Sequence, residues 1–403
     1  MAHDLNIRQF FRRSPRDWLR RYCGNEGVLG NFDWSSLGKR DVEALAEAWL
    51  ALDGDTRGRM LSDFNNIKLL ATPAGKMQMI DEAAYHGKQE EVAVKLSELR
   101  DFYDCAFWIK LEHSECWEGA VFFATADRRS KHYWRKRVNM PRLGRLPTAA
   151  NGQALAAALT PLFQRTEGRG DFCVVEQYRR GEREYYFAYP QDHKETSMEF
   201  RGGEMIKQPR NPVFEIIFVH NDEQQTLSIW HDGPKERVRD LQVAFAKAVL
   251  GQDIRRDSPR DDRAYDLEPF LNPDFTFTPA PVLGIKSVEV RKLRVRVFGE
   301  GGCTIRIDLA NEAASHVLYD KLVSALVGVP QTQRRVSLVG LRATFEPQPG
   351  ERQARTRSFE LVSPNSCSLA NDHRGTVLQR MLQDHRIEPR RSLEHDDASN
   401  GAN

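Results

Sequence analysis

The spacing of hydrophobic positions changes character along this chain. In the first hundred residues apolar side chains recur every three or four positions, as at Val42, Leu45, Ala46 and Trp49. That spacing places them on one side of an α-helix. Short polar or glycine-containing breaks separate several such stretches. We therefore predict a helical N-terminal domain over residues 1–103.

From residue 104 the pattern favours strands. Cys105–Leu111 and Ala120–Thr125 are apolar runs on either side of a polar segment, and we expect a strand at each. An alanine-rich helix is predicted over Gln153–Phe163. Phe172–Tyr178 and Glu184–Tyr189 then flank a glycine-containing turn, which is typical of a β-hairpin.

A strand, a turn, a second strand and an amphipathic helix then follow one another three times. The third pass is the least regular, because its turn is rich in Pro, Gly and Arg. Few residues are identical between the passes, so we interpret them as similar packed units and not as a solenoid. The fold class predicted is α+β, with the helical N-terminal domain followed by mixed or antiparallel sheets built from recurring strand–strand–helix units. The predicted strand pairs are Val213–His220 with Thr226–Trp230, Arg291–Phe298 with Cys303–Leu309, and Val336–Phe345 with Ser358–Val362.

Composition shifts suggest where the domains divide. Gln252–Asp262 is dense in Arg and Asp and contains a proline, which is typical of a linker or exposed loop. We predict an α+β domain over 104–255 and a second one, containing strand–strand–helix units, over 256–387. Residues 388–403 contain almost no apolar side chains, so we expect a disordered tail.

Charge is balanced overall but not locally. The chain has 59 Lys and Arg against 57 Asp and Glu, a formal net charge of +2. Between Asp127 and Glu167, however, there is no acidic residue, and two aromatic residues lie among the cations. Basic side chains neutralise phosphates and exposed aromatics stack on bases, so this window is a candidate nucleic-acid-binding segment. Its alternative is a solvated loop with a core tryptophan. The candidate residues are Arg128, Arg129, Lys131, Tyr133, Trp134, Arg135, Lys136, Arg137, Arg142 and Arg145.

A second basic row lies in the predicted strand at 291–298. Lys292, Arg294 and Arg296 alternate with apolar residues, so they should share the open face of an amphipathic hairpin. That face is a further candidate for contact with a phosphate backbone. The alternative is an ordinary solvated sheet face.

Catalytic motifs are not found. The sequence has no phosphate-binding loop, dinucleotide fingerprint, nucleophile elbow or zinc-protease motif. A weak nuclease-like trace consists of Asp274 and Glu289, which could supply the two carboxylates of a metal-dependent nuclease. Arg291, however, occupies the position where such a nuclease needs a lysine. Cys105, His113 and Cys116 supply three soft ligands where a structural zinc site needs four. We predict no catalytic residue, no metal site and no cofactor.

Targeting signals point to the cytoplasm. The first residues lack the apolar stretch of a signal peptide, no apolar run is long enough to span a bilayer, and six cysteines are scattered singly. The function expected is that of a non-enzymatic intracellular macromolecule-binding protein with nucleic acid as the leading partner. Two alternatives stay open. One is a protein-interaction subunit of a bacterial multi-protein system, for defence or for a mobile element, and the other is a divergent metal-dependent nuclease.

Overall fold

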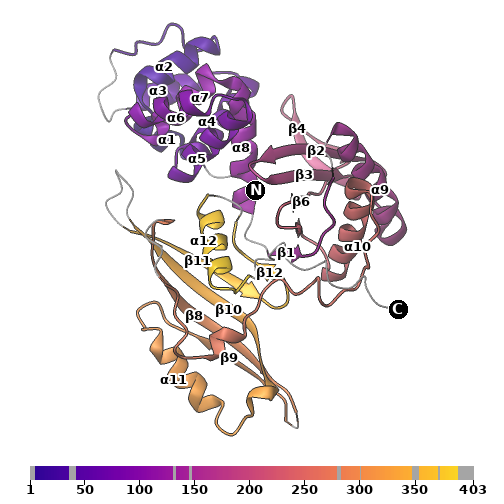
Figure 1. The fold of residues 1–403 in the computed structure, drawn as a ribbon. Coiled ribbons are helices and arrows are strands. Elements are labelled where there is room, and N and C mark those ends of the chain that lie inside the picture. The colour runs from indigo at the N-terminus through magenta and orange to yellow at the C-terminus, as the bar shows by residue number, and fades with distance from the viewer. Residues whose placement is uncertain are drawn as a thin grey trace. The chain divides into compact units, whose positions relative to one another are not determined.

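A computed structural model describes residues 5–35, 42–129, 133–144, 148–278, 283–299, 301–346, 354–370 and 373–388. The fold is α+β, as predicted (Figure 1). The chain divides into two compact units. The first is Met1–Arg129 with Ala370–His373, and the second is Ser130–Leu369 with Arg374–Asn403.

The first unit is helical and packs around one apolar core in which Phe64, Ile67 and Phe107 are fully buried. Apart from the segment between α2 and α3, its helices follow one another with short connections, and their three-to-four spacing of apolar residues accounts for the shared core. Their bounds are α1 (Ile7–Arg13), α2 (Arg16–Asn25), α3 (Glu43–Leu50), α4 (Gly54–Leu70), α5 (Pro73–Tyr85), α6 (Gln89–Glu98), α7 (Phe102–Glu112) and α8 (Ser114–Arg129).

The two strands predicted at Cys105–Leu111 and Ala120–Thr125 are wrong, because both segments lie inside helices α7 and α8. Residues 104–109 are all buried, so α7 is apolar on every side and shows no helical period in its sequence. A short, continuous apolar run of this kind reads equally well as a buried strand. The local helix signal is Asp101, whose carboxylate accepts hydrogen bonds from the backbone N–H of Tyr103 and Asp104 in a capping box.

The second unit is built on a ten-stranded sheet in which every recorded pair of strands is antiparallel. The strand order is β2-β3-β6-β7-β1-β12-β11-β10-β8-β9, so β1 and β12 join two five-stranded halves. The first half contains β1 (Trp134–Arg137), β2 (Cys173–Arg180), β3 (Arg183–Pro190), β6 (Ile216–Asn221) and β7 (Thr226–His231). The second half contains β8 (Ile285–Val297), β9 (Thr304–Asp308), β10 (Arg334–Phe345), β11 (Arg355–Val362) and β12 (Ser366–Cys367).

The recurring strand–strand–helix units are confirmed. They are β6-β7-α10, β8-β9-α11 and β10-β11-α12, and the predicted hairpin of β2 and β3 forms as well. The helices of this unit are α9 (Ala149–Glu167), α10 (Lys235–Phe245, followed by the π-turn Ala246–Leu250), α11 (His316–Ala325) and α12 (His373–Asp384). A separate two-stranded sheet, β4 (Glu195–Arg201) with β5 (Glu204–Arg210), was not predicted.

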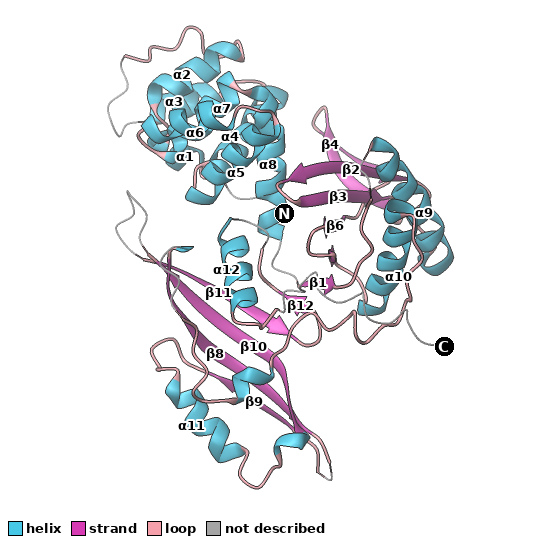
Figure 2. Ribbon diagram, in the orientation of Figure 1, coloured by secondary structure: helices cyan, strands magenta, loops and turns pink. Residues whose placement is uncertain are grey.

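The helices of the two halves cover opposite faces of the one sheet. In the first half α9 and α10 pack on the face that carries Phe218 and Ile229. In the second half α11 and α12 pack on the face that carries Leu361 and Cys367. Residues opposite one another in an antiparallel pair point to the same side of the sheet. Ile229, Arg135 and Ser366 are opposite one another in turn, so they share a face. Cys367 is the neighbour of Ser366 in β12 and therefore points to the other face. The helix layer therefore changes sides at β1 and β12 (Figure 2).

Candidate nucleic-acid interface

Two neighbouring hollows lie where the helix layer changes sides. One has a volume of about 260 Å³ and the other about 480 Å³, and Lys235, Arg294 and Val362 line both. They therefore form a single depression, named here the junction groove, on the face of the second half-sheet opposite α11 and α12. The other residues of the first hollow are Tyr133, Arg135, Lys292, Leu293, Arg306, Asp308, Leu338, Glu360 and Ser366. Those of the second are Pro259, Arg263, Tyr265, Leu267, Glu268, Arg296, Phe298, Arg335, Val336, Ser337, Ser363 and Pro364.

Strand register brings the two basic segments of the sequence to the same face. Arg294 on β8 is opposite Arg306 on β9 and Leu338 on β10, and the row continues through Val362 and Ser366. Its next member is Arg135 on β1. Strands lie about 4.8 Å apart, so the Cα atoms of Arg294 and Arg135, four strands apart, are separated by roughly 19 Å. The acid-free window and the β8 row thus contribute cations to one surface.

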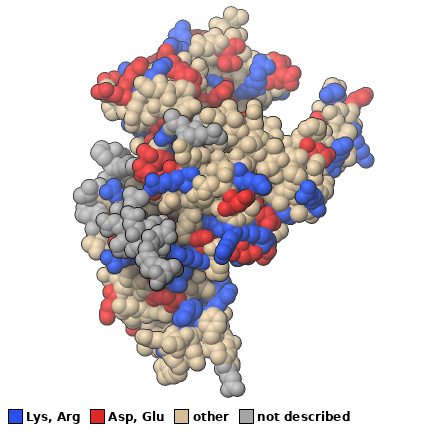
Figure 3. Space-filling model, turned by 45° about the vertical axis from the view of Figure 1, so that its right-hand side comes forward, with Lys and Arg blue, Asp and Glu red and all other residues tan. Residues whose placement is uncertain are grey.

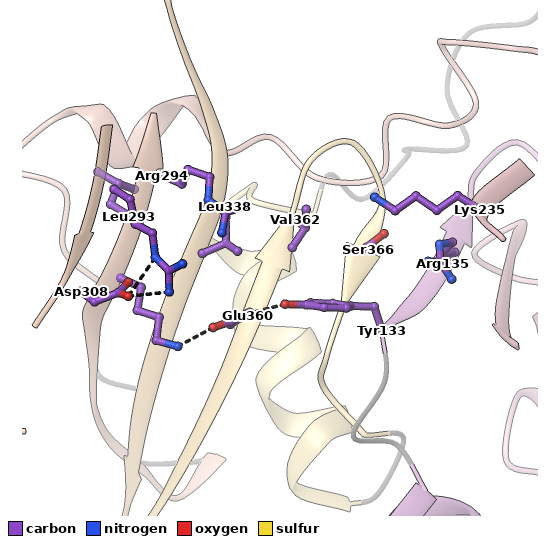
Figure 4. A pocket seen from close by; sticks show the side chains of 12 residues that line it. Tyr133, Arg135, Lys235, Leu293, Arg294, Asp308, Leu338, Glu360, Val362 and Ser366 are labelled. Atoms are coloured by element: carbon purple, nitrogen blue, oxygen red, sulfur yellow. Dashed lines mark hydrogen bonds and ion pairs between the residues drawn. The ribbon is translucent and has the colours of Figure 1, made fainter. Parts of the chain in front are cut away.

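The first half-sheet supplies one wall of the junction groove. Because α10 covers this face there, the groove ends against the start of that helix, and Lys235 is its first residue. Figure 4 shows Lys235 and Tyr133 extending toward β11, with Arg294 on the other side of the hollow. Lys235 carries no signal in the sequence, because its place in the groove depends on how two halves of the sheet join.

A bonded chain of side chains crosses the floor of the first hollow. The Nζ atom of Lys292 donates to Oε1 of Glu360 at 2.8 Å, and the hydroxyl of Tyr133 donates to Oε2 of the same carboxylate. To reach Glu360 on β11, the Lys292 side chain passes over Gly340 on β10. A Cβ atom at Gly340 would lie 2.8 Å from Cβ of Lys292 and 3.0 Å from its Cγ. Glycine at this position therefore makes room for the lysine stem.

These contacts shift the pKa values of Glu360 and Tyr133. Burial alone would raise the pKa of Glu360, but the hydrogen bonds from Lys292 and Tyr133 outweigh it and lower the pKa below its ordinary value. Burial and the bond to Glu360 raise the pKa of Tyr133 to about 12. Glu360 is thus a carboxylate near neutral pH, and Tyr133 is a neutral donor.

Several cations of the groove have no carboxylate partner among the described residues. Lys292 pairs with Glu360, Arg306 with Asp308, and Arg263 with Asp266. The remaining cations of the lining form no ion pair in the part of the chain that the structure describes. Burial lowers the pKa of the half-buried Arg135, and the distant charge of Glu236 offsets only part of that effect. The unpaired cations are Arg135, Lys235, Arg294, Arg296 and Arg335.

Three candidates from the acid-free window are buried away from the groove. Trp134 and Lys136 are on the opposite face of β1, where Lys136 forms a buried ion pair with Glu388. Arg137 is 1% exposed, and its guanidinium donates to the backbone carbonyl of Arg255 and to the side chain of Gln242. The charge pattern suggested that these three side chains are exposed, whereas the structure shows that they are buried. Alternation places Arg137 on the same face of β1 as Arg135, but Arg137 is buried against Gln242 of α10, so Arg135 is the β1 residue that lines the groove.

The other candidates of the window do not line the groove. Arg128 and Arg129 end α8 in the helical unit, and their side chains lie outside the described residues. Lys131 and Arg145 also lie outside the described residues. Arg142 is exposed but belongs to neither hollow.

Residues of the nuclease-like trace are held in structural contacts. The carboxylate of Glu289 accepts a hydrogen bond from Arg342 at 2.7 Å. Arg291 donates to the backbone carbonyl of Ala313 at 2.6 Å. Within the described ranges there is no group of three or more His, Cys, Asp or Glu side chains placed to hold a metal ion.

Charge outside the groove is mixed. Figure 3 shows Lys and Arg interspersed with Asp and Glu over the face that it presents, in agreement with the balanced composition. No helix within the described ranges is both long enough and apolar enough to cross a membrane.

Comparison with protein-family models, curated proteins and solved structures finds no match for this chain. A function is therefore inferred from the groove itself.

Proposed function

We propose that the protein binds nucleic acid in the junction groove and that this binding involves no chemical reaction. The observation that carries the proposal is the set of five unpaired cations that line one depression, drawn from β1, α10, β8 and β10. A half-buried guanidinium without a carboxylate, such as Arg135, loses hydration without an ion pair in return. A phosphate group placed in the groove would restore that compensation through charge-assisted hydrogen bonds.

The lining suits a polyanion better than a small anion. Arg294 and Arg135 are roughly 19 Å apart across the sheet. One phosphate cannot contact both, whereas a chain of phosphates can. Leu338 and Val362 have no hydrogen-bonding side-chain groups, and Glu360 is bonded to Lys292 and Tyr133, so we expect backbone contacts to dominate over sequence reading.

The test is a titration of fluorescently labelled DNA and RNA with the full chain at several salt concentrations. If all five unpaired cations contact phosphates, the logarithm of the binding constant should fall with the logarithm of salt concentration with a slope of roughly −3.5 to −4.5. Arg135→Ala and Arg294→Ala should each weaken binding and reduce that slope by roughly 0.7. Glu360→Gln, which frees Lys292, should strengthen binding and steepen the slope.

Arg142→Ala is the matched control, because this arginine is exposed, comes from the same acid-free window and lies outside both hollows. It should bind as the wild type does. No binding at low salt would refute the proposal. Wild-type affinity in Arg135→Ala and Arg294→Ala would also refute the assignment of the groove. A stoichiometric complex with an acidic protein, without affinity for nucleic acid, would instead favour the protein-interaction alternative.

A further inference from the structure

An exposed aromatic side chain lies in the larger hollow of the junction groove. Phe298 follows β8 directly and is 52% exposed, beside Arg296 and Arg335 in the lining. Its backbone is held firmly, since the N–H of Phe298 donates to the carbonyl of Gln333 at 2.9 Å. The preceding residue, Val297, is bonded in both directions to Cys303. The ring is therefore presented to solvent from a fixed strand end.

A half-exposed aromatic ring among arginines offers apolar area that a ligand can bury. Burying a phenylalanine side chain is worth about 1.5 to 3 kcal/mol, and packing against α11 and α12 on the other face is how neighbouring apolar residues of β8 gain it. Phe298 makes no such contact in the apolar core around β8. A ligand that stacks on this ring is flat, apolar on its faces and compatible with adjacent cations. An unpaired nucleobase attached to a phosphate backbone meets all three conditions.

A duplex does not meet them, because its bases are stacked and paired and present only their edges in the grooves. Arg294 and Arg296 are alternate residues of one strand, so their Cα atoms are about 6.7 Å apart. Their guanidinium groups can therefore contact neighbouring phosphates of one nucleic-acid strand.

We propose that the junction groove binds single-stranded nucleic acid, with one unpaired base stacked on Phe298 and successive phosphates on Arg294 and Arg296. This inference rests on the proposed function and adds the strandedness of the ligand. An acidic protein segment would use the same arginines but has no group that stacks on the ring in the same way. Every base has two apolar faces, so the stacking position is expected to tolerate sequence changes.

The experiment compares three ligands by fluorescence anisotropy with the full chain: a labelled 12-nucleotide poly-dT strand, a labelled single strand of mixed sequence, and the mixed-sequence strand annealed to its complement. The two single strands should bind with similar affinity, and both more tightly than the duplex. Phe298→Ala should weaken single-strand binding by roughly 5- to 150-fold, the loss of one stacked base. The salt slope should not change in this variant, because stacking releases no counterions. Arg296→Ala, in contrast, should reduce the slope by roughly 0.7.

The matched control is Phe200→Ala, since Phe200 is 79% exposed on the separate β4–β5 hairpin and lines neither hollow. It should bind as the wild type does, and Phe298→Trp should retain affinity through its larger ring. Equal affinity for single strand and duplex, or wild-type binding by Phe298→Ala, would overturn this inference while the proposed function stands. Failure of all three ligands to bind at low salt would overturn both.

Discussion

Two buried histidines should make the second unit sensitive to mild acid. His220 on β6 and His231 at the end of β7 both lie under the α9 and α10 layer, with His220 beside Phe245 and His231 beside Phe163. Burial lowers the pKa of His220 to about 4, and the charge of Asp222 offsets only part of that effect. Burial likewise lowers the pKa of His231 to about 4.

The sign follows from proton binding. In the unfolded chain these imidazoles titrate near 6.5, whereas in the folded protein they titrate near 4. Between these values the unfolded state binds more protons, so stability is fully present above pH 6.5 and falls as the pH falls toward 4. At about 1.4 kcal/mol per pKa unit, lowering the pH from 7 to 5 costs roughly 2 kcal/mol for each histidine. The pair together costs about 4 kcal/mol, a large part of the 5 to 15 kcal/mol that holds most domains folded.

The assay is urea unfolding at pH 7 and pH 5, followed by circular dichroism and tryptophan fluorescence. The midpoint should fall by more than about 1 M between the two conditions. The double variant His220→Leu, His231→Leu keeps the apolar packing but cannot titrate, so most of the loss should disappear whatever its stability at pH 7. His193→Leu is the control, because His193 is exposed. An equal loss of stability in wild type and double variant would refute the reasoning.

Two further predictions concern the strands that build the groove. Arg137→Met should lower the free energy of unfolding by about 3 to 5 kcal/mol in urea titrations, since it removes a buried cation and the donor to the backbone carbonyls of Arg255 and Arg256; a loss below about 1 kcal/mol would show that those carbonyls find other partners. Gly340→Ala should cost about 1 to 3 kcal/mol, because its Cβ collides with Cβ of Lys292; if the Lys292–Glu360 ion pair survives in a crystal structure of the variant, the space argument is wrong.

Local patterns were sufficient for most elements of the fold. The hairpin of β2 and β3 and the three strand–strand–helix units follow from alternating apolar residues, a turn and an amphipathic helix, all within a few tens of residues. The misread segments, α7 and α8, show the limit of that reasoning. α7 is buried on all sides over residues 104–109, so its apolar residues show no period, and the capping residue Asp101 distinguishes it from a strand. α8 has exposed Ser114, Glu115 and Glu118, but its short apolar run taken alone does not show the helical period.

Candidate site residues were located less well, for a related reason. A run of cations in sequence does not say which side chains face outward, and β1 alternates Arg135 into the groove with Lys136 into an ion pair on the other face. Phe298 and Lys235 carried no sequence signal. Each of these residues lines the groove because segments that are distant in the sequence pack beside it.

By itself, the sequence determined the α+β class, the repeated units and the outward row of Lys292, Arg294 and Arg296, because each depends on periodicity within one or two adjacent elements. Tertiary structure alone decided that β1 would pair with β12, more than 200 residues away, and that the helix layer would change sides there. Pairing between distant strands is set by the shape and packing of whole layers and leaves no local periodicity to read. The junction groove exists only because of that pairing.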